Sequence, residues 1–271
     1  MFRYCIISIF LYATAIVANA QDCRYADSLM QAGRYEMAAI EYERCHYLAT
    51  TAEASQTALH RKAECYKQMQ RFDLVATTLK RCAESYDDLL QLTLSLYLSG
   101  LFAQAVETAE SAALQYDTTA ADLLLLQTLA LNEMGQYDAA HAVALRMAAT
   151  LPPERGDTLR AVIEQCYAQP PKLKSEDKAR WLSLIPGLGH LYAGYPLEAV
   201  AAFTINAAAL GFGVWQVFER CYITAYIGGA GLLSATYPGA MRSATIHAKK
   251  TNERRTAQFN QQCRERLVDG L

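Results

Sequence analysis

Residues 30–45, MQAGRYEMAAIEYERC, return in altered form three more times along the chain. The matching stretches are KQMQRFDLVATTLKRC at 67–82, YLSGLFAQAVETAESA at 97–112 and NEMGQYDAAHAVALRM at 132–147. In each, a small or β-branched residue follows an aromatic residue by three positions, and Cys, Ala or Met follows it by ten. The aromatic residues are 37, 30 and 35 positions apart, and a regular period of this length indicates an array of structural repeats.

Each repeat is expected to be two antiparallel helices joined by a tight turn. A glycine at the turn lets the first helix end in a left-handed conformation, and the aromatic residue opens the second helix. A small residue one helical turn later lets the two helices approach closely. The second repeat departs from the pattern, with Gln70 where the glycine is expected. The repeat residues are Gly33, Tyr35, Ala38, Phe72, Gly100, Phe102, Ala105, Gly135, Tyr137 and Ala140.

This pattern resembles the tetratricopeptide repeat (TPR), whose period is about 34 residues. The resemblance implies an all-α, TPR-like superhelix over residues 21–168, with about four units and a closing helix. It also implies a concave face that binds a peptide or a partner protein, whose identity it leaves open. The alternative is an irregular helical bundle with the same apolar stripes.

The N-terminus, MFRYCIISIFLYATAIVANAQ, reads as a secretory signal peptide over residues 1–20. Arg3 precedes an apolar run, and Ala18-Asn19-Ala20 is a small-x-small cleavage site. The alternative is an uncleaved membrane anchor. Behind it, residues 21–170 carry 20 acidic and 12 basic residues, whereas residues 241–271 carry 3 acidic and 7 basic residues. This asymmetry argues against one uniform soluble domain.

Six basic residues crowd the first half of the repeats, where an acidic ligand or simply a solvated helix face would explain them: Arg34, Arg61, Lys62, Arg71, Lys80 and Arg81.

Cys23 and Cys45 stand almost symmetrically about the Gly33 turn. Two antiparallel helices would bring them side by side, and export to an oxidising compartment permits a disulfide between them. Such a bond would stabilise the first repeat by about 2–4 kcal/mol. The alternative is two buried thiols.

The second half of the chain is predicted to enter a membrane. A Pro- and charge-rich linker at 169–180 separates it from the repeats. Two segments of 20 residues without a charge follow, at 199–218 and 222–241, each long enough to span a bilayer as a helix. They are rich in Gly and Ala, which favours a closely packed, Gly-rich two-helix transmembrane hairpin. The alternative is a pair of buried helices in a soluble core.

The stretch LSLIPGLGHLYAGYPLEA at 182–199 lies just before the hairpin. Its glycine spacing does not fit a dinucleotide-binding loop, and it lacks the Lys of a phosphate-binding loop. It resembles a P-G-x-G-[QH]-x-Y-x-G pattern in bacterial membrane modules similar to TM2-type domains. We therefore expect a membrane module over 181–241 that begins with an interfacial or re-entrant segment at 181–196. The motif residues are Pro186, Gly187, Gly189, His190, Tyr192, Gly194 and Asn206.

Two sequence signals predict opposite orientations of the hairpin in the membrane. Basic residues flank it on both sides, and the positive-inside rule would place both flanks in the cytoplasm. The signal peptide acts first during synthesis, so we expect the inner membrane of a bacterium, with the repeats facing the periplasm. The basic polar tail at 242–271 would then lie against anionic membrane lipid.

These features predict a membrane-anchored TPR scaffold for protein–protein interaction in the cell envelope. The alternative is a subunit of an envelope assembly or transport complex that acts through its hairpin, which would also suit a homo-oligomer. The sequence has no metal-spaced histidine pair and no nucleophile motif, so we expect no enzyme, no catalytic residue, no cofactor and no metal. An acidic, exported repeat domain also disfavours nucleic acid as a partner.

Overall fold

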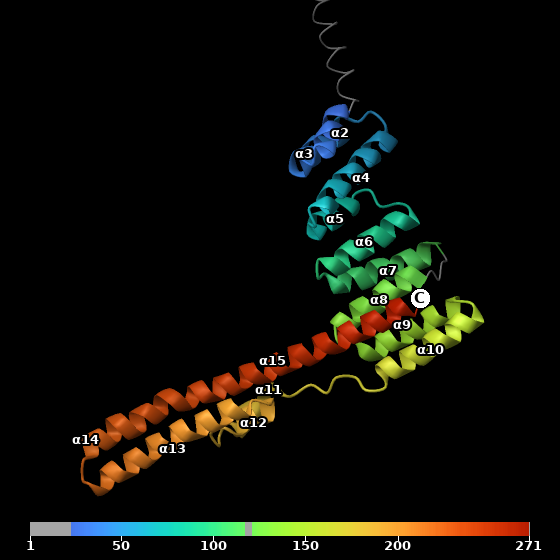
Figure 1. The fold of residues 1–271 in the computed structure, drawn as a ribbon. Coiled ribbons are helices and arrows are strands. Elements are labelled where there is room, and N and C mark those ends of the chain that lie inside the picture. Colours follow the sequence, from blue (N-terminus) through green and yellow to red (C-terminus); the bar gives the residue numbers. More distant parts are fainter. Residues whose placement is uncertain (1–22, 117–120, 271) are drawn as a thin grey trace, which may run out of the picture. The chain divides into compact units, whose positions relative to one another are not determined.

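The computed structural model describes residues 23–116 and 121–270, and the predicted signal peptide lies outside these residues. All regular structure in the described part is helical, so the chain is all-α there (Figure 1). The chain divides into two compact units. The first runs to Tyr167 and also includes residues 267–271, and the second is Ala168–Arg266.

The first unit is a series of helices in which each contacts the next along the chain. The helices form four consecutive pairs and a closing helix. In order these are α2 Arg24–Gln31 with α3 Tyr35–Leu48, α4 Ala52–Gln68 with α5 Phe72–Leu79, α6 Tyr86–Leu98 with α7 Phe102–Tyr116, α8 Ala121–Glu133 with α9 Tyr137–Thr150, and α10 Pro153–Tyr167.

The four turns inside these pairs have one geometry. Gly33, Gln70, Gly100 and Gly135 all have φ between 56° and 78°, in the left-handed region. At each turn the residue after the left-handed one donates its backbone N–H to the carbonyl five positions earlier, at 2.8–2.9 Å. This bond closes the first helix by satisfying a carbonyl that would otherwise lack a partner. The aromatic residue that begins the second helix of each pair lies two positions after the left-handed residue.

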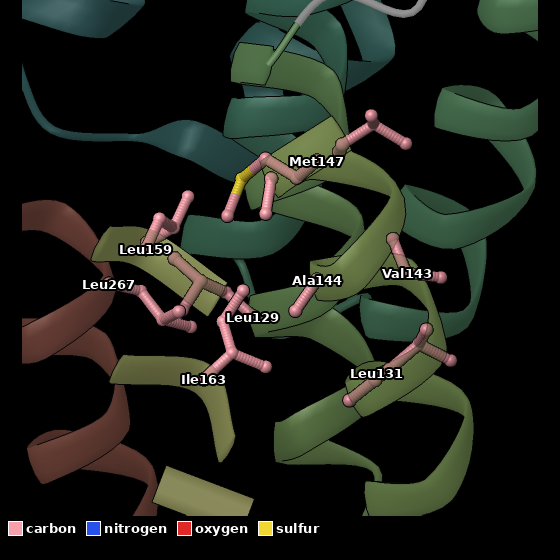
Figure 2. Close-up of a cluster of buried hydrophobic side chains, with 11 residues drawn as sticks. Leu129, Leu131, Val143, Ala144, Met147, Leu159, Ile163 and Leu267 are labelled. Carbon is pink, nitrogen blue, oxygen red and sulfur yellow. The ribbon is translucent and has the colours of Figure 1, made fainter. Parts of the chain in front are cut away.

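Small side chains set the spacing within each pair. Ala38, Ala105 and Ala140 are fully buried, and Val75 takes the same place in the second pair. The largest apolar cluster lies where α8, α9 and α10 meet, and Met147, Leu159 and Ile163 are completely buried in it. Figure 2 shows Leu267, one of the C-terminal residues of this unit, beside Leu159 and Ile163. The apolar face of the last pair is thus covered, as a helical array requires at its end.

The second unit contains two long helical segments that lie side by side (Figure 1). It begins with two short helices, α11 Glu176–Leu182 and α12 Leu188–Ala193. The first long helix is α13 Pro196–Phe218. A turn leads to α14 Tyr222–Thr224, the π-helix η1 Ala225–Gly231 and α15 Leu232–Asp269.

Two boundaries of this unit differ from the sequence-based expectation. α11 begins inside the segment predicted as a linker, because Ser175 caps it by accepting a hydrogen bond from the Lys178 backbone N–H at 3.2 Å. The predicted second span and the predicted tail are not separate, since α15 runs without interruption for 38 residues through Pro238.

We predict that Gln70→Gly stabilises the first unit. A side chain in the left-handed region costs about 1–2 kcal/mol, and glycine removes this cost while losing part of the gain to unfolded-chain entropy. We expect the free energy of unfolding to rise by about 1 kcal/mol. Urea unfolding of the full chain in detergent measures this. The control is Gln91→Gly, an exposed position within α6, which should lower stability by about 1 kcal/mol. A lower free energy of unfolding for Gln70→Gly would contradict the inference that Gln70 is strained in its left-handed conformation.

Candidate functional site

The second unit has its large apolar side chains on the outside. α13 is the one described helix that is long and apolar enough to cross a membrane, and only 17% of its most apolar window is buried. The residues that it does bury are Ala199, Asn206 and Ala209, which are small or polar. In contrast, Leu197 and Phe218 are more than 80% exposed. This distribution is the reverse of a water-soluble helix, and such a continuous apolar surface marks an interaction or membrane site.

Inside the hairpin, glycines bring the two long segments to backbone contact. A Cβ atom added to Gly229 of η1 would lie 2.5 Å from the Cα of Gly213 on α13. One added to Gly213 would lie 3.0 Å from the Gly229 Cα. Close approach through small residues is how helices associate in lipid. These two glycines therefore form a contact within the chain, and they are not part of a surface for another molecule.

The buried Asn206 of α13 has its hydrogen bonds satisfied within the hairpin. Asn206 accepts a hydrogen bond from the Thr236 hydroxyl at 3.0 Å, which ties α13 to α15. Its amide nitrogen donates to the Ala202 carbonyl at 2.7 Å. This arrangement gives Asn206 a structural role, because both ends of its amide are occupied.

The P-G-x-G segment packs against both long helices through its glycines. A Cβ on Gly187 would lie 2.5 Å from the Ala199 carbonyl oxygen of α13, and φ there is +93°. A Cβ on Gly189 would lie 1.9 Å from the Ser183 Oγ and 2.5 Å from the Ala179 carbonyl oxygen of α11. Neither site has room for any side chain. Gly194 ends α12 at φ +96°, with the same carbonyl-to-N–H pattern as the repeat turns.

His190 of α12 faces α15. It is 3% exposed, and its ring centroid lies 5.4 Å from that of His247. His247 in turn stacks on Tyr195, with ring centroids 4.0 Å apart. The Nδ1 atoms of both histidines are buried without a hydrogen-bond partner among the described residues. Burial and the neighbouring His247 lower the pKa of His190, and Glu198 opposes this shift.

The chain before α11 is fixed to α15 by side chains of the predicted tail. Asn252 accepts from the Lys174 backbone N–H and donates to the Lys174 carbonyl, both at 2.7 Å. Arg255 donates to the Lys172 carbonyl at 2.7 Å, and Tyr192 accepts from the Ser175 N–H at 3.1 Å. Residues 172–175 are therefore held in place, although their composition predicts a linker.

Sequence reasoning missed the α15 half of this site. Thr236, His247, Asn252 and Arg255 each bond or pack on a segment more than 29 positions away, and no local pattern shows such a pairing. Their spacing of 11, 5 and 3 positions is visible in the sequence, and it is compatible with one broad face of a long helix. The sequence instead predicts a membrane span at Thr236 and a basic polar tail against lipid from residue 242 onward.

The first unit carries an exposed apolar stripe on α6. Leu94 and Leu98, one helical turn apart, are 40% and 47% exposed. On the buried side of the same helix, Thr93 and Ser95 donate their hydroxyls to the carbonyls four residues earlier, at 2.7 Å. α6 thus buries Leu92 and Leu96 together with these two hydroxyls, and leaves Leu94 and Leu98 on its exposed side.

Internal ion pairs occupy three of the six basic residues listed for the first half. Lys62 and Arg81 both contact Glu43, at 2.6 and 2.9 Å, and these hydrogen-bonded cations lower the pKa of Glu43 against the opposing effect of burial. Arg71 pairs with Asp73 at 3.2 Å. An acidic ligand would have to compete with these carboxylates for Lys62, Arg71 and Arg81.

Cys23 and Cys45 lie together at the start of the first unit. Both are thiols in the structure. Burial, followed by a hydrogen bond between the two thiol groups, raises the pKa of Cys45 to about 12. The two thiols are therefore neighbours, and the disulfide between them stays a prediction.

Comparisons with protein-family models, with curated proteins and with solved structures gave no significant match.

We predict that Gly189→Ala destabilises the second unit. The new Cβ would overlap Ser183 and α11, and overpacking of this kind costs about 1–3 kcal/mol. Thermal unfolding of the full chain in detergent measures the loss. Gly239→Ala on α15 is the matched control, because a Cβ there meets nothing within 4 Å, and alanine favours the helix by about 1 kcal/mol. Equal melting temperatures for the two variants would refute the packing argument.

We predict that His190 makes the second unit less stable in acid. Its pKa is lowered on folding, so the unfolded chain binds the proton more readily. The stability is complete above the unfolded pKa of about 6.5 and is lost as the pH falls below it. Melting temperatures from about pH 7.5 to about pH 5 should fall for the wild type and fall less for His190→Gln, which stays neutral. An unchanged slope in His190→Gln would contradict the assignment.

Proposed function

We propose that the protein is a non-enzymatic scaffold of the bacterial cell envelope, with TPR-like repeats that bind a partner protein and a transmembrane hairpin that anchors them. The observation that carries the proposal is the reversed distribution of side chains in the second unit. Large apolar residues face outward along α13, and small or hydrogen-bonded polar residues face inward. Lipid is the environment in which this distribution is favourable.

The length of α15 supports a partial insertion. At 1.5 Å per residue, its 38 residues extend about 57 Å, which exceeds the hydrocarbon core of about 30 Å. The uncharged residues 222–241 suit the core, and the helix from Arg242 onward carries the basic residues. The second half of α15 would then project from the membrane as a helix beside residues 172–175. Its cations would lie near lipid head groups.

The segment at 181–196 suits the membrane interface. Trp181 is 69% exposed, and Leu184, Ile185 and Leu191 are also exposed. Its backbone is covered on the other side by α13 and α15 through Gly187 and Gly189. Non-helical backbone at membrane depth needs such cover from protein.

The four identical turns and the repeated small residues support the TPR-like assignment of the first unit. A repeat array of this kind offers a continuous surface for a partner. The α6 leucine stripe, Leu94 and Leu98, is the part of this surface that we assign to partner binding. A transport role would need a polar path through the hairpin, whereas Asn206 and Thr236 bond to each other.

Reporter fusions test the anchoring. A reporter active only in the periplasm and one active only in the cytoplasm are placed after Pro170, Arg220 and Leu271. We expect periplasmic activity at Pro170 and Leu271 and cytoplasmic activity at Arg220, because a hairpin returns both flanks to one side. The same cells give an independent result from cysteine alkylation. Cys23 and Cys45 should resist alkylation until reduced if the repeats are exported. Activity on one side at all three points would contradict the hairpin.

Site-specific crosslinking in cells tests partner binding. A photoreactive residue at Leu94 should give a discrete adduct, because this side chain lies in the exposed apolar stripe. The adduct should disappear when Leu98→Glu is added. The control is the same photoreactive residue at Leu114 of α7, which is more exposed, at 85%, but lies outside the stripe. Equal adducts from Leu94 and Leu114 would mean that the stripe is not the partner site.

A further inference from the structure

One side of the hairpin is hollowed along the seam between its two long segments. A hollow of about 770 Å³ lies between Phe203 and Leu210 of α13, Leu233 and Pro238 of α15, and Pro186 of the interfacial segment. A second hollow of about 380 Å³ shares Leu210 and Leu233 and continues along the seam to Val217 and Tyr222. We call the two together the hairpin furrow.

The furrow follows a single face of α13. Its α13 residues recur every three or four positions from Phe203 to Val217, which is the spacing of one helix face. These 14 residue steps correspond to about 21 Å along the helix. One leaflet of the hydrocarbon core is about 15 Å thick, half of the roughly 30 Å total. The furrow is therefore long enough for the acyl chain of one lipid.

The walls of the larger hollow are mostly hydrocarbon, and its polar side chains already have partners. Three polar side chains line the larger hollow, and each one already bonds within the chain. Tyr237 donates to the Leu184 carbonyl at 2.7 Å, Ser234 donates to the Gly231 carbonyl at 2.7 Å, and Asn206 is paired with Thr236. A polar ligand would gain no hydrogen bond here, whereas an alkyl chain would gain contact area.

The charges at the two ends of the furrow are different. Arg242 lies one helical turn beyond Pro238 on the same face of α15. It is exposed and forms no ion pair within the described part of the chain. The acidic Glu198 lies five positions before Phe203, away from the furrow face of α13. At the far end, Glu219 and Arg220 follow Phe218 directly, and their opposite charges offset each other. The exposed cation of Arg242 therefore favours a phosphate group at its own end of the furrow.

We propose that the hairpin furrow binds one anionic glycerophospholipid, with an acyl chain between α13 and α15 and the phosphate at Arg242. The proposal rests on the membrane anchoring proposed above and adds a specific lipid to it. The bound lipid would fill the apolar hollow that the hairpin leaves open and would fix the register of the interfacial segment through contact with Pro186.

Native mass spectrometry of the full chain in detergent tests the site. Phosphatidylglycerol is the probe, and phosphatidylcholine is the zwitterionic comparison. We expect one retained phosphatidylglycerol per chain. Ala207→Trp fills the larger hollow and should lower its retention at least tenfold. Ala208→Trp is the matched control, since Ala208 is the adjacent exposed residue and lines neither hollow. It should bind like the wild type.

Arg242→Gln tests the head group without altering the furrow. It should lower the preference for phosphatidylglycerol over phosphatidylcholine about fivefold, the effect of one cation near a lipid surface. Arg254→Gln, further along α15, should leave the preference unchanged. Equal lipid retention by Ala207→Trp and Ala208→Trp, or an unchanged preference in Arg242→Gln, would overturn the proposal.

Two further measurements, of oligomeric state and of membrane extraction, distinguish lipid binding from a second copy in the furrow and from a failure of anchoring. A wild-type dimer that Ala207→Trp converts to a monomer, without change in bound lipid, would mean that a second copy occupies the furrow, and would also overturn the proposal. Alkaline carbonate extraction of cell membranes tests anchoring independently. If carbonate releases the wild-type chain, the anchoring fails; if the chain resists release while lipid retention is insensitive to Ala207→Trp, only the lipid site fails.

Discussion

Backbone contact at positions without a side chain is the constraint on which the second unit depends. Gly189 touches α11 and lies near Ala244 of α15, and Gly187 touches the start of α13. Gly213 and Gly229 then hold the two long segments together further along. Each contact allows dispersion interactions between backbones that would otherwise be separated by side chains. Because the segment at 181–196 is held from three sides, His190 is brought against His247.

The two units bury opposite kinds of side chain. In the first, apolar side chains such as Leu159 and Ile163 are removed from water in a continuous core. In the second, the buried residues of α13 are alanines and an asparagine, and the leucines and aromatics lie outside. Water drives the first arrangement through the hydrophobic effect. In the membrane proposed above, hydrocarbon would remove that drive between helices, and close packing and internal hydrogen bonds would stabilise the second arrangement.

Left-handed turns recur in both units and end their helices in the same way. Gly33, Gly100 and Gly135 do so between repeat helices, and Gly194 does so after α12. Gln70 and Arg220 take the same conformation without being glycines. The turn geometry is therefore imposed by the packing of the helices on either side, and glycine only makes that geometry easier to adopt.

The sequence by itself determined the helical class, the four repeat turns and the uncharged length of α13. Each follows from local chemistry: the aromatic-to-alanine spacing is a helical period, and a run of 20 uncharged residues is visible without a structure. The sequence also suggested that Cys23 and Cys45 meet, because both flank one turn. Only the tertiary structure decided what α15 does. Thr236, His247 and Asn252 gain their partners from segments 30 to 78 positions away. Such pairings depend on where α12 and α13 come to lie, which no local pattern encodes.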